Sequence, residues 1–283
     1  MAKTSVVLNG KEIAEKILSA AAAKIALLKK AGASLTLATV QVGNAKDSLL
    51  YSQALDRLLK KVGIAHVPSV SSQKISEEEL CEKIEALNEN PSITGIMVFA
   101  PLPPAFDTAT VLNAVDQMKD VEGRTFMKSH FGVFSPTANA VMTLLKESGV
   151  ELAGKEAVVI GHSDLVGKPV AILLLDEMAT VTVCHAKTTG LRQKIAKADI
   201  LIAAAGKPEL VKGDWIKSGA VVIDVGENVV NGKLVGDVEF DQAKKKTSFI
   251  SPVPGGVGPV TNVMLVQNLL RLHSLRNLKN GNH

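Results

Sequence analysis

Apolar runs of strand length alternate with helical patterns along the first half of the chain. Three of these runs predict strands, at residues 35–42, 66–70 and 95–99. Helices are expected between them, over residues 48–62 and from Ser76 to about residue 88, where Glu79 completes a capping box with Ser76. Strands that return through helices pair in parallel, so this half predicts a small parallel sheet with right-handed crossovers.

The second half repeats the alternation at a more regular spacing. Its apolar runs predict strands at residues 156–161, 179–185, 199–206 and 220–226. Helical patterns occupy residues 139–148, 165–177, 191–198, a short stretch near Trp215 and, last, about 261–277. This rhythm is typical of a doubly wound dinucleotide-binding fold.

The patterns together predict an α/β protein with two domains, for which 283 residues are enough. Residues 1–140 are expected to form an N-terminal three-layer α/β domain on a parallel sheet, which binds the substrate. Residues 141–260 are expected to form a Rossmann-like, doubly wound domain that binds NAD(P). The final helix, about 261–277, is expected to pack back on the first domain.

Composition narrows the class of protein. Only 3% of residues are aromatic, so the core must rest on aliphatic side chains, which suits a parallel sheet covered on both faces. The net charge of +4 is mild and gives no case for nucleic acid. No apolar run reaches the length of a membrane span, and no spacing suggests a metal site. Two isolated cysteines, Cys81 and Cys184, and a start without a signal-peptide pattern predict a cytoplasmic protein.

The first candidate for chemistry is the turn GHSDLVGKP, residues 161–169, which follows a predicted strand. It offers Gly161 at the strand end, the Ser163 hydroxyl and Gly167 where a helix begins. Backbone N–H groups and the helix dipole favour an anionic pyrophosphate in such a turn. A plain strand-to-helix turn is the alternative. The turn follows the first strand of a βαβ unit, where this fold places phosphates, and that context favours the cofactor.

The end of the next strand distinguishes NADP from NAD. An NAD site usually places Asp or Glu there to hold the ribose 2′-hydroxyl, whereas this strand ends in CHAKT, residues 184–188. The missing carboxylate, together with Lys187 and His162, favours a 2′-phosphate and therefore NADP. A solvated Lys187 without a role is the alternative.

The most unusual segment, SPVPGGVGPVT at residues 251–261, precedes the last helix. Six of the eight residues 252–259 are glycine or proline. Glycines allow positive φ and close approach of the backbone to a ligand, while prolines fix the shape of a loop. A structural turn would need only one or two such residues, so the segment predicts a ligand-binding loop.

These motifs resemble the bifunctional methylenetetrahydrofolate dehydrogenase/methenyltetrahydrofolate cyclohydrolase family. The similarity rests on PVPGGVGPVT, GHSDLVGKP, CHAKT and KDVEG, and extends over nearly the whole chain through VLNGKEIAEKI, GIMVFAPLP and GKLVGDVEF. It implies an enzyme of one-carbon metabolism that binds a folate substrate and oxidises 5,10-methylenetetrahydrofolate with NADP. It also implies a homodimer that forms through the cofactor domain.

The resemblance further implies which residues form the site. A catalytic role is implied for Tyr51 and Glu122. The implied substrate-binding residues are Tyr51, Leu55, Val98, Phe99, Ala100, Pro254, Gly255, Gly256, Val257 and Gly258. The implied cofactor-binding residues are Gly161, His162, Ser163, Gly167, Lys168, Ala186, Lys187, Thr188, Gly206, Gly226 and Glu227.

Several positions depart from the pattern of that family. Its cyclohydrolase lysine stands four residues after the tyrosine, where this chain has Leu55, and the glutamine that tunes the lysine is replaced by Phe99. Glu122 stands in place of the aspartate that hydrogen-bonds the pterin. In the cofactor half, His162 replaces an arginine and Ala186 replaces a serine.

The departures separate the two chemistries. Hydride transfer depends chiefly on positioning, but hydrolysis of the methenyl cation needs proton transfers that neither Leu55 nor Phe99 can provide. Arg57 does not deprotonate and Lys60 points toward another face of its helix, so we expect the cyclohydrolase activity to be weak or lost. Two alternatives stay open: a nicotinamide-dependent dehydrogenase of a non-folate substrate, and a catalytically silent relative that binds nucleotide or a partner protein.

Overall fold

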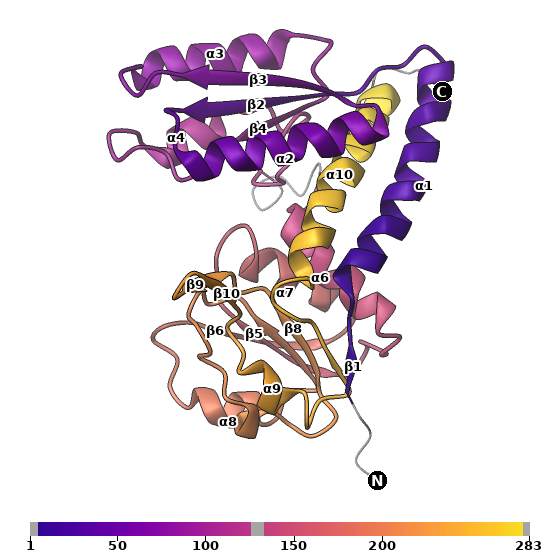
Figure 1. The fold of residues 1–283 in the computed structure, drawn as a ribbon, viewed down its shortest axis with the longest axis vertical. Coiled ribbons are helices and arrows are strands. Elements are labelled where there is room, and N and C mark those ends of the chain that lie inside the picture. The colour runs from indigo at the N-terminus through magenta and orange to yellow at the C-terminus, as the bar shows by residue number, and fades with distance from the viewer. Residues whose placement is uncertain (1–4, 126–132, 280–283) are drawn as a thin grey trace. The chain divides into compact units, whose positions relative to one another are not determined.

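The computed structural model describes residues 5–125 and 133–279 (Figure 1). The chain divides into two compact units. Unit 1 is Met1–Glu15 with Ser135–Met264, and unit 2 is Lys16–Phe134 with Leu265–His283, in each case for the residues described. Helices α1 (Gly10–Lys30) and α10 (Val257–Lys279) contribute to both units, because the division falls inside them.

Two features of the chain account for these limits. Unit 1 resumes at Ser135, which begins α6 (Pro136–Glu147): its Oγ accepts a hydrogen bond from Ala138 N–H at 3.1 Å. The first residues of the chain join unit 1, because strand β1 (Val6–Val7) pairs in parallel with β11 (Phe249–Ile250).

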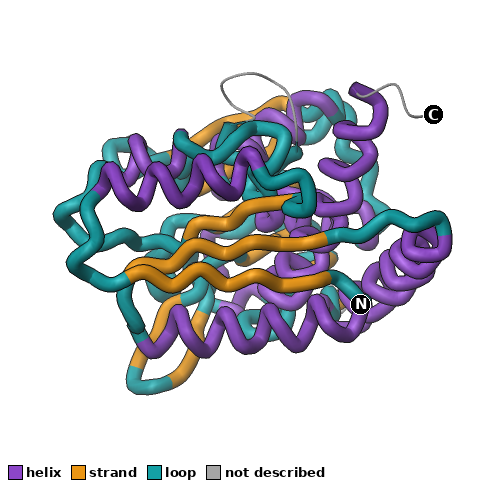
Figure 2. Tube along the Cα trace, turned by 90° about the horizontal axis from the view of Figure 1, so that it is seen from above, coloured by secondary structure: helices purple, strands orange, loops and turns teal. Residues whose placement is uncertain are grey.

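Unit 2 is built on a three-stranded parallel sheet, whose strands run side by side with helices on both sides (Figure 2). In the order β3-β2-β4, its strands are β3 (Ala65–Ser71), β2 (Thr36–Val42) and β4 (Gly95–Val98). The helices are α2 (Lys46–Val62) and α3 (Glu77–Glu89), which connect the strands, and the short α4 (Thr108–Asn113).

The two connecting helices of unit 2 cover opposite faces of its sheet. Successive residues of a strand point to opposite faces, and the buried Val40 packs in one core cluster with Leu80 of α3. Thr39 points to the other face, where its Oγ1 lies 3.0 Å from His66 Nε2. The Nδ1 atom of His66 lies 3.4 Å from the Asp56 carboxylate of α2. The sheet is therefore the middle of three layers.

Unit 1 is built on a six-stranded parallel sheet with the order β1-β11-β8-β7-β5-β6. Its remaining strands are β5 (Glu156–Ile160), β6 (Thr180–Cys184), β7 (Ile200–Ala203) and β8 (Val221–Asp224). Its other elements are α7 (Gly167–Asp176), α8 (Leu191–Ile195), the 3-10 helix η1 (Gly213–Trp215), α9 (Phe240–Ala243) and the antiparallel hairpin of β9 (Asn228–Val230) and β10 (Lys233–Val235). The strand order reverses between β5 and β7, which makes this the switch point of the sheet.

The predicted fold class, α/β with two parallel sheets and a Rossmann-like C-terminal half, is confirmed. The capping box of Ser76 with Glu79 is present, and α2 ends at Gly63 with φ +79°. The last helix begins at Val257, four residues earlier than expected, so the end of the glycine-proline segment is helical. Within the described residues, none of the helices combines the length and the apolar character that crossing a membrane requires.

Candidate functional site

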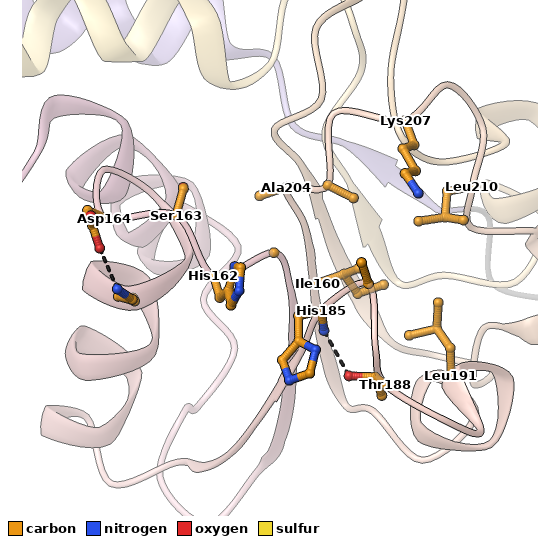
Figure 3. A pocket seen from close by; sticks show the side chains of 14 residues that line it. Ile160, His162, Ser163, Asp164, His185, Thr188, Leu191, Ala204, Lys207 and Leu210 are labelled. Atoms are coloured by element: carbon orange, nitrogen blue, oxygen red, sulfur yellow. Dashed lines mark hydrogen bonds and ion pairs between the residues drawn. The ribbon is translucent and has the colours of Figure 1, made fainter. Parts of the chain in front are cut away.

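The carboxyl ends of β5, β6 and β7 form one pocket of about 650 Å³ in unit 1 (Figure 3). Three loops, each following one of these strands, supply most of its wall. The lining residues are Ile160, Gly161, His162, Ser163, Asp164, Lys168, His185, Ala186, Thr188, Leu191, Ala204, Ala205, Lys207 and Leu210. The pocket thus lies at the switch point, where open α/β sheets bind their ligands.

The pocket brings together about half of the residues expected to bind a cofactor. Those that line it are Gly161, His162, Ser163, Lys168, Ala186 and Thr188. Those outside its lining are Gly167, Lys187, Gly206, Gly226 and Glu227. The pocket also includes His185, Lys207 and Leu210, which sequence reasoning missed. Only their position after strands of the sheet could have indicated them: His185 directly follows β6, and Lys207 and Leu210 follow β7 at the same edge of the sheet.

Backbone packing explains two glycines of the turn after β5. Gly161 has φ +117°, and a Cβ at this position would overlap the carbonyl oxygen of Ala204. A Cβ on Gly167 would overlap the carbonyl oxygen of Gly161, so the start of α7 sits directly against the turn. Ser163 closes the turn, since its Oγ accepts a hydrogen bond from Val166 N–H at 3.2 Å. Its hydroxyl proton remains available to a ligand.

The charged side chains that line the pocket are mostly basic. Lys168 Nζ lies 2.5 Å from Asp164 Oδ1, so these two charges largely neutralise each other. Lys207 adds a second cation from the loop after β7. The loop after β6, residues 184–188, carries no carboxylate. This balance favours an anionic ligand, and a phosphate in particular.

Two buried carboxylates hold the loops next to the pocket. Asp237 accepts hydrogen bonds from the N–H groups of Ala205, Gly206 and Lys207 and from Asn228 Nδ2. Asp224 accepts hydrogen bonds from the N–H groups of Gly226, Asp237 and Val238. Burial raises the pKa of Asp224 to about 6, while these three donors act in the opposite direction. A Cβ on Gly226 would overlap the Asp237 carboxylate, so this expected cofactor residue belongs to the loop framework.

The glycine-proline segment is tied to the start of the chain within unit 1. Gly10 N–H donates to the Gly255 carbonyl oxygen at 2.9 Å, and a Cβ on Gly10 would overlap the carbonyl oxygen of Gly256. Gly255 itself has φ +105° and open space where its Cβ would be. Gly258 lies in the first turn of α10, where the Glu227 carboxylate would be 2.8 Å from its Cβ. The segment therefore presents bare backbone at Gly255.

In unit 2, the residues expected to bind substrate form an apolar cluster. Tyr51 and Leu55 lie one turn apart on the same face of α2, and Leu55 is buried. Phe99 follows β4 and is also buried; its ring meets the Tyr51 ring edge-on, with centroids 5.6 Å apart. Tyr51 remains 36% exposed, so its ring is open to a ligand.

The KDVEG motif runs alongside β4 and places Glu122 next to this cluster. Ile96 N–H donates to the Lys119 carbonyl oxygen at 2.7 Å, and Ile96 and Asp120 form a parallel bridge. Two residues further on, the backbone of Val98 forms a hydrogen bond with the Glu122 carboxylate. The motif therefore continues the sheet by a short stretch that ends at Glu122.

Two other charged residues of KDVEG serve the fold. Lys119 is buried, and its Nζ donates to three carbonyl oxygens at the end of α3, those of Leu87, Asn88 and Asn90. A cation at this position also favours the dipole of α3. Asp120 accepts from Glu122 N–H and from the N–H and hydroxyl of Thr125. Only Glu122 faces the Tyr51 cluster with its charge.

The electrostatics of this cluster depend on one ion pair. Arg124 donates to Glu122 twice, from Nε to Oε2 and from Nη2 to Oε1, each at 3.1 Å. Burial raises the pKa of Glu122, and the Arg124 charge and hydrogen bond oppose that rise. Burial and the nearby Glu122 charge together raise the pKa of Tyr51 to about 12. At neutral pH the tyrosine is therefore a hydrogen-bond donor and not a base.

Comparison with known proteins places both halves of the chain. The family models for the tetrahydrofolate dehydrogenase/cyclohydrolase catalytic domain and its NAD(P)-binding domain match residues 8–122 and 135–277. The bifunctional protein FolD of Pelobacter propionicus is 48% identical over 273 residues, covering 93% of this chain and 96% of the relative. FolD 2 of Geobacter sulfurreducens is 47% identical, with coverage of 93% and 95%. The chain belongs to the tetrahydrofolate dehydrogenase/cyclohydrolase family.

Solved structures agree with this family over nearly the full length. The crystal structure of the bifunctional enzyme FolD, methylenetetrahydrofolate dehydrogenase/cyclohydrolase, from Campylobacter jejuni superposes with a TM-score of 0.92 at 37% identity, covering 96% of this chain and 99% of that one. The Trypanosoma brucei methylenetetrahydrofolate dehydrogenase-cyclohydrolase, complexed with NADP cofactor and inhibitor, gives a TM-score of 0.89, also at 37% identity and with the same coverage.

For this member of the tetrahydrofolate dehydrogenase/cyclohydrolase family, the matches assign each cluster to a domain. The 650 Å³ pocket lies in the NAD(P)-binding domain, and the Tyr51 cluster lies in the catalytic domain. The departures noted in the sequence are concentrated in these same clusters. Leu55 and Phe99 make the catalytic-domain cluster apolar, and His162 and Ala186 line the pocket.

Proposed function

We propose that this protein is an NADP-dependent 5,10-methylenetetrahydrofolate dehydrogenase whose methenyltetrahydrofolate cyclohydrolase activity is weak or lost. The observation that carries the dehydrogenase is the basic pocket at the switch point of the NAD(P)-binding domain. The observation that carries the weak hydrolase is a buried leucine, Leu55, one turn after Tyr51. In this proposal residues 1–140 hold the folate and residues 141–260 hold the dinucleotide.

The residues of the pocket fit NADP. Its volume of about 650 Å³ lies in the usual range of ligand pockets. The donors that line it are of the kinds that bind phosphate: the hydroxyl of Ser163, the imidazoles of His162 and His185, and the ammonium of Lys207. The T. brucei relative is complexed with NADP. The absence of a carboxylate in the loop after β6 therefore supports NADP and not NAD as the cofactor.

The catalytic-domain cluster has the means to hold a flat, partly polar ring system. NADP, once bound, supplies the hydride acceptor, so the work left to the chain is to position the substrate and exclude water. Tyr51 offers an aromatic face beside Phe99, and its raised pKa keeps the hydroxyl protonated. Glu122 offers carboxylate oxygens next to the same cluster. In this proposal Tyr51 stacks the pterin and Glu122 accepts a hydrogen bond from it.

Loss of the hydrolase follows from where basic groups stand on α2. A general base or acid must reach the reacting group with a pKa near the working pH, and Leu55 has no proton to exchange. Lys60 is 73% exposed in its side chain and is paired with Asp56 at 2.7 Å. It lies five residues after Leu55, on a different face of the helix. We infer that Lys60 does not replace a lysine at position 55.

A second candidate is a nicotinamide-dependent dehydrogenase of a substrate other than a folate. One observation favours it: both oxygens of Glu122 already accept hydrogen bonds from Arg124. A carboxylate held this way has fewer free lone pairs for a pterin. The cluster would then select an apolar ring through Tyr51 and Phe99 and would need no anion at Glu122.

We further propose a homodimer that forms through the NAD(P)-binding domain. Strand β6 ends the six-stranded sheet, and its outer edge pairs with no other strand among the described residues. Leu175, Met178 and Val183, on and next to this edge, are exposed, Met178 by 74%. Exposed apolar side chains beside an open edge are typical of a surface that a partner covers.

The two unpaired thiols, Cys81 and Cys184, support a reducing, cytoplasmic location.

The proposed function is tested by following two products of one reaction. Purified protein is mixed with NADP+ and 5,10-methylenetetrahydrofolate; NADPH is measured by fluorescence, and the folates are separated by chromatography. We expect NADPH to form while methenyltetrahydrofolate persists, with little 10-formyl product. NADPH with prompt conversion to 10-formyltetrahydrofolate would overturn the loss of hydrolase. Dinucleotide binding without any reduction would favour the second candidate.

A further inference from the structure

Two histidine rings lie next to each other in the lining of the pocket of the NAD(P)-binding domain. His162 comes from the turn after β5 and His185 from the loop after β6; their ring centroids are 5.4 Å apart at an interplanar angle of 37° (Figure 3). Both rings line the 650 Å³ pocket. They stand at the strand end where a doubly wound fold meets the adenosine ribose of its cofactor.

Hydrogen bonds hold His185 in one tautomer. Its backbone N–H donates to Thr188 Oγ1 at 2.8 Å, and Lys187 N–H donates to the ring Nδ1 at 3.2 Å. A ring nitrogen that accepts a hydrogen bond carries no proton, so the neutral ring is protonated on Nε2. His185 therefore presents an Nε2–H donor without taking a charge, and protonating Nδ1 would cost it the bond from Lys187.

His162 is in the opposite situation. No hydrogen bond or ion pair involves its ring among the residues the structure describes. It can therefore take up a proton on either nitrogen without losing an interaction, and the neutral face of His185 can stack against the resulting cation. Of the two rings, His162 is therefore the one that can meet an anion in its doubly protonated form.

The other charged groups near the two histidines are mostly neutralised by partners or remain cationic. Lys168 and Asp164, on α7 and the turn before it, are paired with each other. Asp237, behind the loop after β7, is saturated by four donors. Lys207 on that loop and Lys187 in the loop after β6 are the further cations near the pair. Histidine is the side chain whose ordinary pKa places its change of charge between about pH 5 and 8. Asp224, which accepts a hydrogen bond from Asp237 N–H behind the same loop, also titrates in this range because burial raises its pKa to about 6.

We propose that His162 and His185 form a proton-dependent subsite for the 2′-phosphate, so that this chain prefers NADP over NAD at slightly acid pH and loses much of that preference as pH rises. The proposal rests on the proposed function, since it assigns a specificity to the same pocket. A phosphomonoester carries close to two negative charges at pH 7, with its second pKa near 6. A charged His162 then adds a charge-assisted hydrogen bond that a neutral ring cannot match. His185 contributes its Nε2–H as a second donor.

The test is binding calorimetry on the full-length protein, with a metal chelator present. The probes are adenosine 2′,5′-bisphosphate and NADP+, each compared with its counterpart that lacks the 2′-phosphate, 5′-AMP or NAD+. For the wild-type protein we expect the affinity ratio to fall by about fivefold to tenfold between about pH 6 and pH 8. 5′-AMP and NAD+ should bind with little change over this range.

Matched variants at one position separate charge from shape. His162→Arg keeps a cation at all pH values, so the preference for the 2′-phosphate should stay high and flat from about pH 6 to 8. His162→Gln keeps a polar side chain without charge, so the preference should be low and equally flat. His185→Gln should lower affinity at all pH values and leave the slope of the wild type.

The possible failures are distinguishable. A wild-type ratio that does not change with pH, or a slope that survives in His162→Gln, would overturn the subsite while leaving NADP as the cofactor. A ratio near one at every pH would overturn both the subsite and the choice of NADP over NAD. If neither dinucleotide binds at any pH, the proposed dehydrogenase fails together with the subsite.

Discussion

Arg124 holds Glu122 through two parallel hydrogen bonds, each 3.1 Å long, although only Gly123 separates them in the chain. Gly123 has φ +66°, a conformation that lets the chain turn back so that the guanidinium meets the carboxylate of the residue two before it. Both side chains are largely buried. Burial raises the pKa of Glu122; Arg124 opposes that rise most strongly, and the hydrogen bond from the Val98 backbone opposes it less. The charge state of the substrate-side cluster therefore depends on a residue outside the KDVEG motif.

Replacing Arg124 with leucine should destabilise the fold in a pH-dependent way. Without the cation, the pKa of Glu122 rises further above its ordinary value of 4.5. A carboxyl whose folded pKa is raised stabilises the fold below its unfolded pKa and loses that contribution as pH rises through the folded value. The loss in free energy of unfolding should thus be small near pH 4.5 and reach about 2 kcal/mol at neutral pH. Urea unfolding at several pH values measures it.

Arg192→Leu is the matched control, because Arg192 also pairs with a carboxylate, Asp214, at 3.1 Å but with both side chains exposed. An exposed pair contributes little, and this variant should lose less than about 0.5 kcal/mol at every pH. If Arg124→Leu lost no more than the control, or lost the same amount at acid and neutral pH, Arg124 would not be what sustains the charge of Glu122.

The parts of the protein that follow from short-range patterns were predictable from sequence. Alternation of apolar runs and helices gave the parallel sheets, and the position of GHSDLVGKP after a strand gave half of the pocket lining. His185 was missed as a lining residue because nothing local marks it; it reaches the pocket only because β6 lies beside β5.

Contacts between distant segments were beyond sequence reasoning. Gly10 packs on Gly255 and Gly256 across nearly the whole length of the chain, and no spacing encodes that approach. The pair of Glu122 with Arg124 is close in sequence but depends on the backbone turn at Gly123. The sequence pattern predicts the last helix from about residue 261, whereas α10 begins at Val257. Glycine and proline suggest a loop there, but proline is tolerated in the first turn of a helix.

Tyr51 is the only tyrosine of the chain, so tyrosinate absorbance reports on it alone. Burial and the Glu122 charge raise its pKa from 10.0 to about 12. A raised pKa means that the tyrosine contributes stability fully below about pH 10 and loses it as pH approaches 12. An ultraviolet pH titration, with circular dichroism confirming the fold, should show this late transition. Glu122→Gln should lower the midpoint only part of the way, since burial is the larger cause. A midpoint near 10 in the wild type would contradict this rise in the pKa of Tyr51.

Asp224 should make the stability of unit 1 depend on pH in an unusual direction. Burial raises its pKa from 3.8 to about 6, so its protonated form stabilises the fold below the unfolded value. That contribution is lost as pH rises through about 6, by at most about 3 kcal/mol. The stability advantage of the wild type over Asp224→Asn should therefore shrink between about pH 4 and 6, measured by urea unfolding. Asp241→Asn, at an exposed position of α9, should show no such trend; an equal trend there would remove the assignment to Asp224.

The proposed loss of hydrolysis is reversible if it lies where we place it. Leu55 and Phe99 are both buried beside Tyr51, so the double variant Leu55→Lys with Phe99→Gln puts an amine and its hydrogen-bond partner in one apolar cluster. Burial favours the neutral amine, the form that can accept a proton near neutral pH. We expect the double variant to hydrolyse methenyltetrahydrofolate at least about tenfold faster than the wild type, and Leu55→Lys alone to gain less.

Hydrolysis is measured as the loss of methenyl absorbance, in a buffer that itself catalyses little hydrolysis. Lys60→Gln is the control for the lysine already present on α2, and it should leave the residual rate unchanged because that side chain is exposed and paired with Asp56. A double variant that still binds folate but gains no hydrolysis would show that the missing chemistry lies elsewhere than at positions 55 and 99.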